Sequence, residues 1–392
     1  MRAWLALPVM ALALTSCAPG PPSAPATQPE ASASNGATSA APSPTPQPPA
    51  CYLRAEALPL RQQVGQLYMA AVSPAGISEA ERTTIRETGV GSLLYLGESK
   101  VAAEKVRELS SSLMGLSDAS LPLLIAVDQE GGTVQRMSGP GFTRIPDAVA
   151  QAKLPEAQLE ASAAEWGAEL RSVGIRYNLA PVADVVPEDN TTRNRPIAQL
   201  RRGYGSDPAQ VGRKVAAFVR GMASAKVATS AKHFPGLGQV VGNTDHEAAT
   251  DSQTGPDSPL WVPFQAAVDA GVSSIMVSSA IYAKLDAETE AMYSTAIVTG
   301  ILREKMGFDK VLISDDVGAA KALEEVPKAE RGTRFLLAGG DLVITADTGA
   351  LSSMMEHTLA KAEQDPRFAA QVTRSAARVL ELKSEVELID CG

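Results

Sequence analysis

Short apolar segments alternate with longer amphipathic ones along most of this chain of 392 residues. Runs such as "LPLLIAVD" (121–128) and "VLISDD" (311–316) are apolar almost throughout, as expected of strands that are covered on both faces. Amphipathic segments, such as "DPAQVGRKVAAFVRGMASA" (207–225), lie between such runs. The segments predicted to form strands span residues 65–72, 90–97, 121–128, 175–185, 227–234, 273–280, 311–316 and 341–347.

The amphipathic segments predict helices between these strands. Asp207 is a suitable N-cap for one helix, and Gly307 is a suitable stop for another. Eight strand-then-helix units in succession predict an α/β fold, a (β/α)8 TIM barrel that forms a single catalytic domain. A doubly wound open sheet is the alternative, but no predicted strand ends in the G-x-G-x-x-G typical of nucleotide binding. The predicted helices include 78–89, 102–115, 207–225, 296–307, 350–364 and a final one over 367–387.

The first fifty residues differ from the rest in composition. A charge at Arg2 and the apolar run from Ala3 to Leu14 predict a targeting signal that is too short to span a membrane. The following "LTSC" resembles a bacterial lipoprotein signal, which implies cleavage before Cys17 and a lipid on that residue; an ordinary secretory signal is the alternative. Residues 18–50 are rich in Pro, Ala, Ser and Thr and predict a flexible tether.

We therefore expect a lipoprotein signal peptide at 1–16, a tether at 17–50 and the catalytic domain at 51–392, anchored by lipid to the cell membrane outside the cytoplasm. There, Cys51 and Cys391 favour a disulfide between the two ends of the folded part. The formal net charge of -9 argues against a nucleic-acid partner. No CxxC and no Cys/His cluster occurs in the sequence, so a zinc site is not expected. Nothing else in the sequence implies a metal or an organic cofactor. Nothing in the sequence indicates the oligomeric state.

Polar residues gather at the carboxyl ends of the predicted strands, which is where barrel enzymes place their active sites. A single acid at such a position is often the N-cap of the next helix. Several on one rim predict an active site instead. These residues are Asp128, Asp184, Lys232, His233, Asp315, Asp316 and Asp347.

Four segments carry a resemblance to a known family. They are "AVDQEGGTVQR" (126–136), "NLAPVADV" (178–185), "KHFPGLG" (232–238) and "GFDKVLISDD" (307–316). In this order they resemble glycoside hydrolase family 3, in its single-domain β-N-acetylglucosaminidase (β-hexosaminidase) branch, over roughly residues 60–382. The resemblance implies a retaining exo-hydrolase that removes terminal β-linked N-acetylglucosamine through a covalent glycosyl-enzyme. For a lipoprotein outside the cytoplasm, peptidoglycan fragments are the expected carbohydrate substrate.

The resemblance also implies roles for single residues. Asp315, the first acid of "ISDD", matches the nucleophile, and Asp316 is expected to cap the next helix or point elsewhere. Asp128 matches a residue that binds ring hydroxyls, to which a carboxylate can make two charge-assisted hydrogen bonds. Lys232 and His233 match a pair that binds hydroxyls at the non-reducing end. Arg202, in "RRGYGSDP", matches an arginine that contacts the sugar.

The loop "KHFPGLGQVVGNTDHE" (232–247) holds two of the three histidines of the chain. In the family an Asp-x-His pair follows KHFPG, and its His is the acid/base. Here Asp245 and His246 are adjacent, so the alignment is open. Without a gap Asp245 takes the His position and Asn243 the Asp position, whereas a loop longer by one residue places His246 there. A two-residue insertion places Glu247 there. Asp245 and His246 are the leading candidates, Glu247 is a third, and none of them is the remaining alternative.

Other functions stay open at this point. A phosphorylase would transfer the sugar to phosphate, which a neutral His acid/base would repel less than a carboxylate would. A β-glucosidase of the same family is a second alternative, because Ser279 stands where the family often has His, near the expected site of the acetamido group. A non-catalytic, sugar-binding lipoprotein is an alternative of another class, which the presence of Asp315 argues against.

Overall fold

The structure of the protein is a computed structural model that describes residues 49–243 and 247–392. Cys17, the signal segment and nearly all of the expected tether lie outside the described residues, and so do Asp245 and His246. The domain boundaries, the lipidation and the roles proposed for these residues therefore stay predictions.

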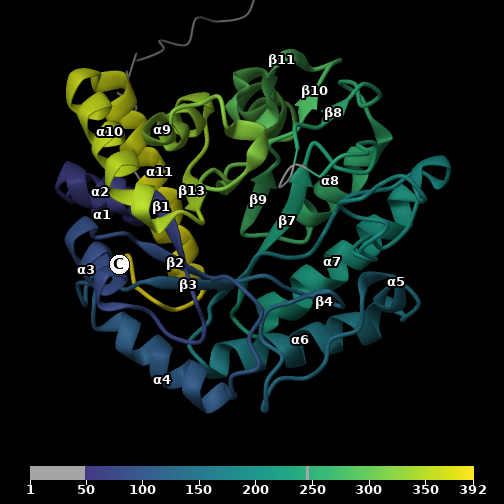
Figure 1. The fold of residues 1–392 in the computed structure, drawn as a ribbon, viewed down its shortest axis with the longest axis horizontal. Helices are drawn as coiled ribbons and strands as arrows, with labels where there is room; N and C mark the ends of the chain where they lie inside the picture. Colours follow the sequence, from purple (N-terminus) through teal and green to yellow (C-terminus); the bar gives the residue numbers. More distant parts are fainter. Residues whose placement is uncertain (1–48, 244–246) are drawn as a thin grey trace, which may run out of the picture. The chain divides into compact units, whose positions relative to one another are not determined.

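The predicted strands form one closed parallel barrel (Figure 1), in the order β1-β13-β12-β9-β7-β6-β3-β2. This confirms the (β/α)8 fold and excludes the open sheet, because β13 pairs with β1 and closes the ring. The barrel strands are β1 (Tyr68–Val72), β2 (Ser92–Tyr95), β3 (Leu124–Val127), β6 (Tyr177–Asn178), β7 (Ala228–Phe234), β9 (Ser274–Val277), β12 (Val311–Asp316) and β13 (Leu342–Thr345).

Helices surround the barrel close to where the pattern predicts them. Asp207 caps α7 by accepting a hydrogen bond from the backbone N–H of Ala209 at 2.9 Å, and Gly307 has a φ of +67°, which suits a residue without a Cβ. The segment predicted as an α-helix at 296–307 is instead the π-helix η4 (Ala296–Lys305). The helices are α1 (Ala50–Glu56), α2 (Leu60–Gln66), α3 (Glu79–Thr88), α4 (Ala103–Met114), α5 (Ala148–Gln151), α6 (Glu156–Ser172), α7 (Pro208–Ser224), α8 (Val262–Asp269), α9 (Lys328–Ala338), α10 (Leu351–Gln364) and α11 (Pro366–Glu385).

The fourth barrel strand is shorter than predicted. The run 175–185 was expected to be one strand, but only Tyr177–Asn178 forms the ladder, followed by an isolated bridge between Val182 and Lys232. Pro181 lacks a backbone N–H and cannot donate to a ladder, so regular pairing stops before it. The rest of this run forms the buried start of the loop that leads to α7.

Short accessory strands extend the rim at the carboxyl ends of the barrel. The hairpin β4 (Gln129–Gly131) and β5 (Val134–Gln135) follows β3 directly. A three-stranded sheet combines β8 (Thr250–Asp251), β10 (Ile281–Tyr282) and β11 (Asp286–Glu290). These additions raise walls around the face where a site is expected.

Within residues 49–243 and 247–392, none of the helices has the length and hydrophobicity that a membrane-spanning segment needs.

Apolar side chains fill the barrel interior, and helix α11 covers the barrel at the amino ends of its strands. Met69, Leu124 and Ile313 from the strands share one buried cluster with Val379 and Leu382 of α11. Each fully buried aliphatic side chain of this kind stabilises the fold by about 1.5–3 kcal/mol. Lys383 of α11 is also buried. Its Nζ donates to Gln66 Oε1 at 2.6 Å and to the carbonyl of Pro122 at 2.8 Å.

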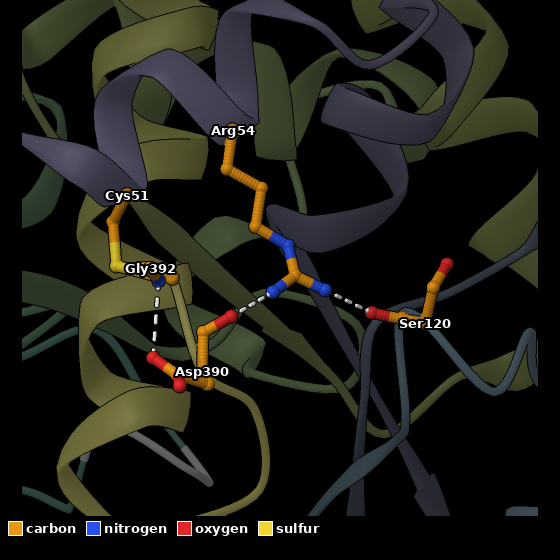
Figure 2. Close-up of a disulfide and its surroundings, with 6 residues drawn as sticks. Cys51, Arg54, Ser120, Asp390 and Gly392 are labelled. Carbon is orange, nitrogen blue, oxygen red and sulfur yellow. Dashed lines mark hydrogen bonds between the residues drawn. A yellow bond between two sulfur atoms is a disulfide. The ribbon is translucent and has the colours of Figure 1, made fainter.

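A disulfide joins the two ends of the described domain (Figure 2), which confirms the predicted pairing of Cys51 with Cys391. Their Cα atoms lie 5.0 Å apart, although 340 positions separate them in the sequence. Arg54 reinforces this junction by donating to the carbonyl of Asp390 and, at 2.5 Å, to that of Ser120, just before β3. The junction therefore lies at the amino ends of the strands, opposite the rim.

Candidate active site

A cavity of about 460 Å³ lies at the carboxyl ends of the barrel strands. This volume falls within the range of roughly 300–1,000 Å³ that is usual for small-molecule sites. Asp184, Asp347 and Glu247 do not line it. The residues to which the resemblance gives a sugar-binding or nucleophile role all do, although they come from separate strands and loops. They are Asp128, Arg202, Lys232, His233 and Asp315.

Two irregular strands allow adjacent residues to face this one cavity. In a regular strand, neighbouring side chains point to opposite faces. The register of β7 on β9 shifts between Ala231 and Phe234, and both Lys232 and His233 line the cavity. The register of β12 on β13 likewise shifts between Ile313 and Asp316, and both acids after Ser314 line the cavity. Irregularities of this kind commonly redirect side chains beside active sites.

A buried cluster of four charges forms one wall. Lys232 Nζ lies 2.6 Å from Asp128 Oδ1 and 2.8 Å from Glu130 Oε1. Glu130 also accepts from Arg202 Nε at 2.9 Å and Arg202 Nη2 at 2.8 Å. The side chains of Lys232 and Glu130 are only 3% and 6% exposed, so bulk water solvates neither charge and each depends on its ion-pair partners. The cluster balances two cations with two carboxylates.

The pKa values in this cluster follow from that balance. Burial alone would raise the pKa of Glu130, but the charges of Arg202 and Lys232 outweigh it and hold the pKa well below its usual value. Burial alone would lower the pKa of Lys232, but Asp128 and Glu130 raise it above the usual value. Glu130, Lys232 and Arg202 therefore keep their charges at neutral pH and form a fixed pattern of donors and acceptors.

A buried acid holds His233. Asp184 is fully buried, and its Oδ2 lies 2.7 Å from Nδ1 of His233. Its Oδ1 accepts from the backbone N–H of His233 at 3.1 Å and that of Leu237 at 2.8 Å. From these partners we assign the imidazole proton to Nδ1, which leaves Nε2 as an acceptor 3.4 Å from Arg202 Nη2.

The two acids of "ISDD" have different surroundings. The carboxylate of Asp316 accepts hydrogen bonds from the backbone N–H groups of Gly318, Ala319 and Ala346, at 2.7–2.9 Å. It thus fixes the turn after β12 and ties it to the end of β13. It does not cap the next helix, η5 (Lys321–Leu323), as predicted, because Ala320 is the residue before that helix. Asp315 lines the cavity and accepts from the N–H of Asp316 at 2.9 Å.

Arg136 and a set of aliphatic side chains complete the cavity. Arg136 lines it, and its Nε is buried without a hydrogen-bond partner among the described residues. Leu94, Met276 and Ile344 supply apolar surface. Ser279, predicted to lie near an acetamido group, is 2% exposed and is not among the residues that line the cavity. The side chain of Ser279 therefore forms no part of the described cavity wall.

Two buried asparagines connect the loop after β6 to the loop after β7. Asn194 Nδ2 donates to the carbonyls of Leu237 at 2.7 Å and Val240 at 2.9 Å. Asn190 Nδ2 donates to the carbonyl of Gly238 at 2.9 Å. Buried amides with several partners of this kind rigidify a segment, so the loop is anchored up to Val240.

Asn243 and Glu247, the described residues nearest to Asp245 and His246, line different cavities. Asn243 lines the cavity described above. Glu247 does not; it pairs with Arg195 at 2.9 Å and lines a neighbouring cavity. Asp245 and His246 are outside the described residues, so the choice between them stays a prediction from the sequence.

Glu130 and Arg136 were given no role in the sequence analysis, and Asp184 was placed on the rim without a partner. Glu130 stands two positions from Asp128, a spacing that places both on one face of a strand. Asp184 interrupts an apolar run, and a buried acid requires a partner. Arg136 belongs to the quoted segment "AVDQEGGTVQR". Each signal was present, but none of them identifies the partner. Among the described residues no group of His, Cys, Asp or Glu could hold a metal ion.

Comparisons with known proteins agree with this geometry. The family profile described as "Glycosyl hydrolase family 3 N terminal domain" matches residues 59–382. A beta-hexosaminidase of Methylococcus capsulatus is 32% identical over 310 residues, which cover 76% of this chain and 89% of the relative.

Solved structures show the same likeness. The crystal structure of a beta-N-acetylhexosaminidase from Beutenbergia cavernae matches with a TM-score of 0.81 and 39% identity, over 83% of this chain and 99% of that one. A family 3 beta-N-acetylglucosaminidase from Paenibacillus matches with a TM-score of 0.77 and 29% identity, over 85% of this chain and 63% of that one.

Proposed function

We propose that this chain, which belongs to glycosyl hydrolase family 3 and is a glycoside hydrolase, removes terminal β-linked N-acetylhexosamine, in particular N-acetylglucosamine. The observation that carries the proposal is the shared cavity. Asp315 at the end of β12 and the charged cluster between β3 and β7 line the same space. A sugar held by the cluster would thus lie within a cavity that also contains a strand-end carboxylate. Membership of the family sets aside the non-catalytic alternative.

In the proposed mechanism Asp315 is the nucleophile. Its carboxylate oxygen forms a bond to the anomeric carbon while the bond from that carbon to the leaving oxygen breaks. A proton from the acid/base passes to the leaving oxygen, which departs as an alcohol. Water then attacks the same carbon, gives a proton back to the acid/base and releases Asp315, so the configuration is retained. Asp316 is a poorer candidate, because its carboxylate already binds three backbone N–H groups.

The charged wall would bind the sugar hydroxyls. Asp128 accepts hydrogen bonds from them, while Lys232 and Arg202 donate to their oxygens with charge-assisted strength. His233 Nε2, directed by Asp184, is a further acceptor. Arg136 offers a donor whose Nε has no other described partner. Such a density of charged groups suits the non-reducing end of a chain, where every hydroxyl is free to hydrogen-bond.

The acid/base is proposed on the loop between Asn243 and Glu247. His246 would titrate near neutral pH with little help from its surroundings, and Asp245 would be a conventional carboxylic acid. Glu247 is the weakest of the three, because it lines the neighbouring cavity and pairs with Arg195. Rescue by azide distinguishes the two leading candidates: only the variant lacking the true acid/base should regain turnover of an activated glycoside.

Trapping with a 2-fluoro glycoside followed by peptide mapping tests the whole proposal. We expect label on the peptide that contains Asp315, and none on the Asp315→Ala variant, which should still bind sugar. Label on Asp316, or full turnover by Asp315→Ala, would refute the assignment. Turnover of the nitrophenyl N-acetylglucosaminide should exceed that of the glucoside; the reverse order would identify a β-glucosidase. Glycosyl phosphate among the products would identify a phosphorylase.

The cellular setting is part of the proposal. If Cys17 carries a lipid, the enzyme acts outside the cytoplasm while anchored to the cell membrane, where peptidoglycan fragments supply terminal N-acetylglucosamine. What supports this is the signal-like N-terminal sequence together with the disulfide, since disulfides persist in oxidising compartments. Radiolabelled fatty acid should be incorporated into the unmodified protein and not into Cys17→Ser.

A further inference from the structure

The side chain of Asn178 continues the pairing of β3 with β6 beyond the end of both strands. The backbone ladder ends where Val127 lies opposite Asn178. Asn178 is fully buried. Its Oδ1 accepts from the backbone N–H of Gln129 at 3.0 Å, and its Nδ2 donates to the carbonyl of Gln129 at 3.2 Å. A carboxamide presents an acceptor and a donor side by side, as a peptide group does, so this side chain binds both backbone groups of Gln129.

The side chain of Gln129 repeats this arrangement one step farther from the barrel. Gln129 is also buried. Its Oε1 accepts from the backbone N–H of Met137 at 3.0 Å, and its Nε2 donates to the carbonyl of Met137 at 2.8 Å. Asn178, Gln129 and Met137 therefore form two successive pairs of a side-chain amide with a backbone, which we call the amide relay. The relay connects the end of β6 to β4 and to the backbone that follows β5.

Two groups that line the cavity stand next to the relay in the sequence. Asp128 directly precedes Gln129, and Arg136 directly precedes Met137. The backbone N–H of Arg136 also donates to the carbonyl of Asp128 at 3.3 Å. Buried polar networks whose members are satisfied hold a segment rigidly. The two pairs of the relay therefore fix the backbone beside each of these groups and, together, the separation of the two groups.

We propose that Asn178 and Gln129 are positioning residues, which hold Asp128 and Arg136 at the separation that the hydroxyls of the terminal sugar require. The inference rests on the proposed function, which gives these two groups their contacts with the sugar. The relay needs an amide at both positions. An ionised acid of the same shape would place a second acceptor against a backbone carbonyl, which leaves that carbonyl without its donor and displaces the backbone.

Nitrophenyl N-acetylglucosaminides that each lack one hydroxyl of the sugar test the proposal. The penalty for a missing hydroxyl is kcat/KM for the complete substrate divided by kcat/KM for the deoxy substrate. The variants are Asn178→Asp and Gln129→Glu, and Asn178→Ser is the milder replacement if thermal denaturation shows either acidic variant to be unfolded. Gln63→Glu is the matched control. Gln63 is a buried amide that binds the carbonyl of Leu58 and Thr373 Oγ1, and none of these three residues lines the cavity.

We expect the penalty for at least one hydroxyl to fall about tenfold in the relay variants, because a displaced Asp128 or Arg136 no longer gains a charge-assisted hydrogen bond from it. A smaller folded fraction lowers kcat/KM equally for every substrate, so a purely structural role leaves all penalties unchanged. Gln63→Glu should show that pattern. Unchanged penalties in the folded relay variants overturn the inference and leave the proposed function intact. Failure of the unmodified protein to hydrolyse the complete nitrophenyl N-acetylglucosaminide would instead overturn the proposed function.

Discussion

Replacing Glu130 by Gln should damage both the stability and the activity of this enzyme. Glu130 does not itself line the cavity, but its carboxylate contacts Lys232 at 2.8 Å and Arg202 at 2.8 and 2.9 Å. Gln keeps the shape and removes the charge. Breaking a buried ion pair from one side costs roughly 3–5 kcal/mol. Because Asp128 stays 2.6 Å from Lys232, we expect the lower end, about 3 kcal/mol.

The kinetic effect should be larger than that of an ordinary destabilising change. Lys232 and Arg202 would lose the partner that fixes their positions, and a displacement of about 1 Å near reacting groups can cost roughly one hundredfold in rate. Glu130 also raises the pKa of Lys232. Its removal lowers that pKa, so the cation is lost at a lower pH. The alkaline limb of the kcat/KM profile should therefore move to lower pH, which a purely structural role would not cause.

Glu160→Gln is the matched control for this variant. Glu160 accepts from Arg220 at 2.8 Å, a contact of the same length, but the two side chains are 40% and 47% exposed. Exposed pairs of this kind contribute roughly 0–1 kcal/mol, so its melting temperature and its kcat/KM should scarcely change. Steady-state kinetics across pH and thermal denaturation measure both variants. If Glu130→Gln keeps the kcat/KM and alkaline limb of the unmodified enzyme, Glu130 does not position the cations.

Three further predictions concern other buried groups. Burial lowers the pKa of Lys383 from 10.5 to about 7. Between these pH values the folded protein binds fewer protons than the unfolded chain, so the free energy of unfolding should rise with pH. Urea titrations at several pH values should show that this free energy rises less steeply with pH in Lys383→Met. An equally steep rise in the variant would contradict the prediction. Removing the Cys51–Cys391 disulfide by Cys→Ser substitution should destabilise the domain by about 2–5 kcal/mol, and equal melting curves with and without reductant would count against it. Asp184→Asn should turn an amide towards His233 Nδ1 and reverse its tautomer, lowering kcat/KM about 10- to 100-fold; NMR of the imidazole nitrogens would show the original tautomer if this reasoning is wrong.

The sequence predicted the barrel because its strands are covered on both faces and are therefore apolar throughout. It also predicted the shared rim, because the ends of parallel strands meet on one face of a barrel. The helix limits agreed where a cap marks them, as Asp207 does for α7. The fourth strand was predicted too long, because an apolar run does not show where Pro181 ends the ladder.

The interior of the site was less predictable, for a physical reason. Alternation along a strand assigns adjacent residues to opposite faces, so the strand pattern by itself does not place Lys232 and His233, or Asp315 and Asp316, on the same cavity. That placement follows from register shifts against neighbouring strands, which depend on contacts distant in sequence. The contacts of Glu130 are also distant in sequence, since Lys232 is 102 positions away and Arg202 is 72 positions away. The sequence pattern therefore does not identify them.

The two ends of the barrel hold different groups. The rim holds the cavity and its charged cluster, whereas the opposite end holds the disulfide, Arg54 and the buried Lys383. Helix α1, where the proposed tether would join the domain, is fastened at that opposite end. A lipid on Cys17, as proposed above, would therefore be joined through α1 to the end of the barrel opposite the cavity. Moving the tether to a loop on the rim should accordingly impair turnover of large, insoluble substrates while sparing small glycosides.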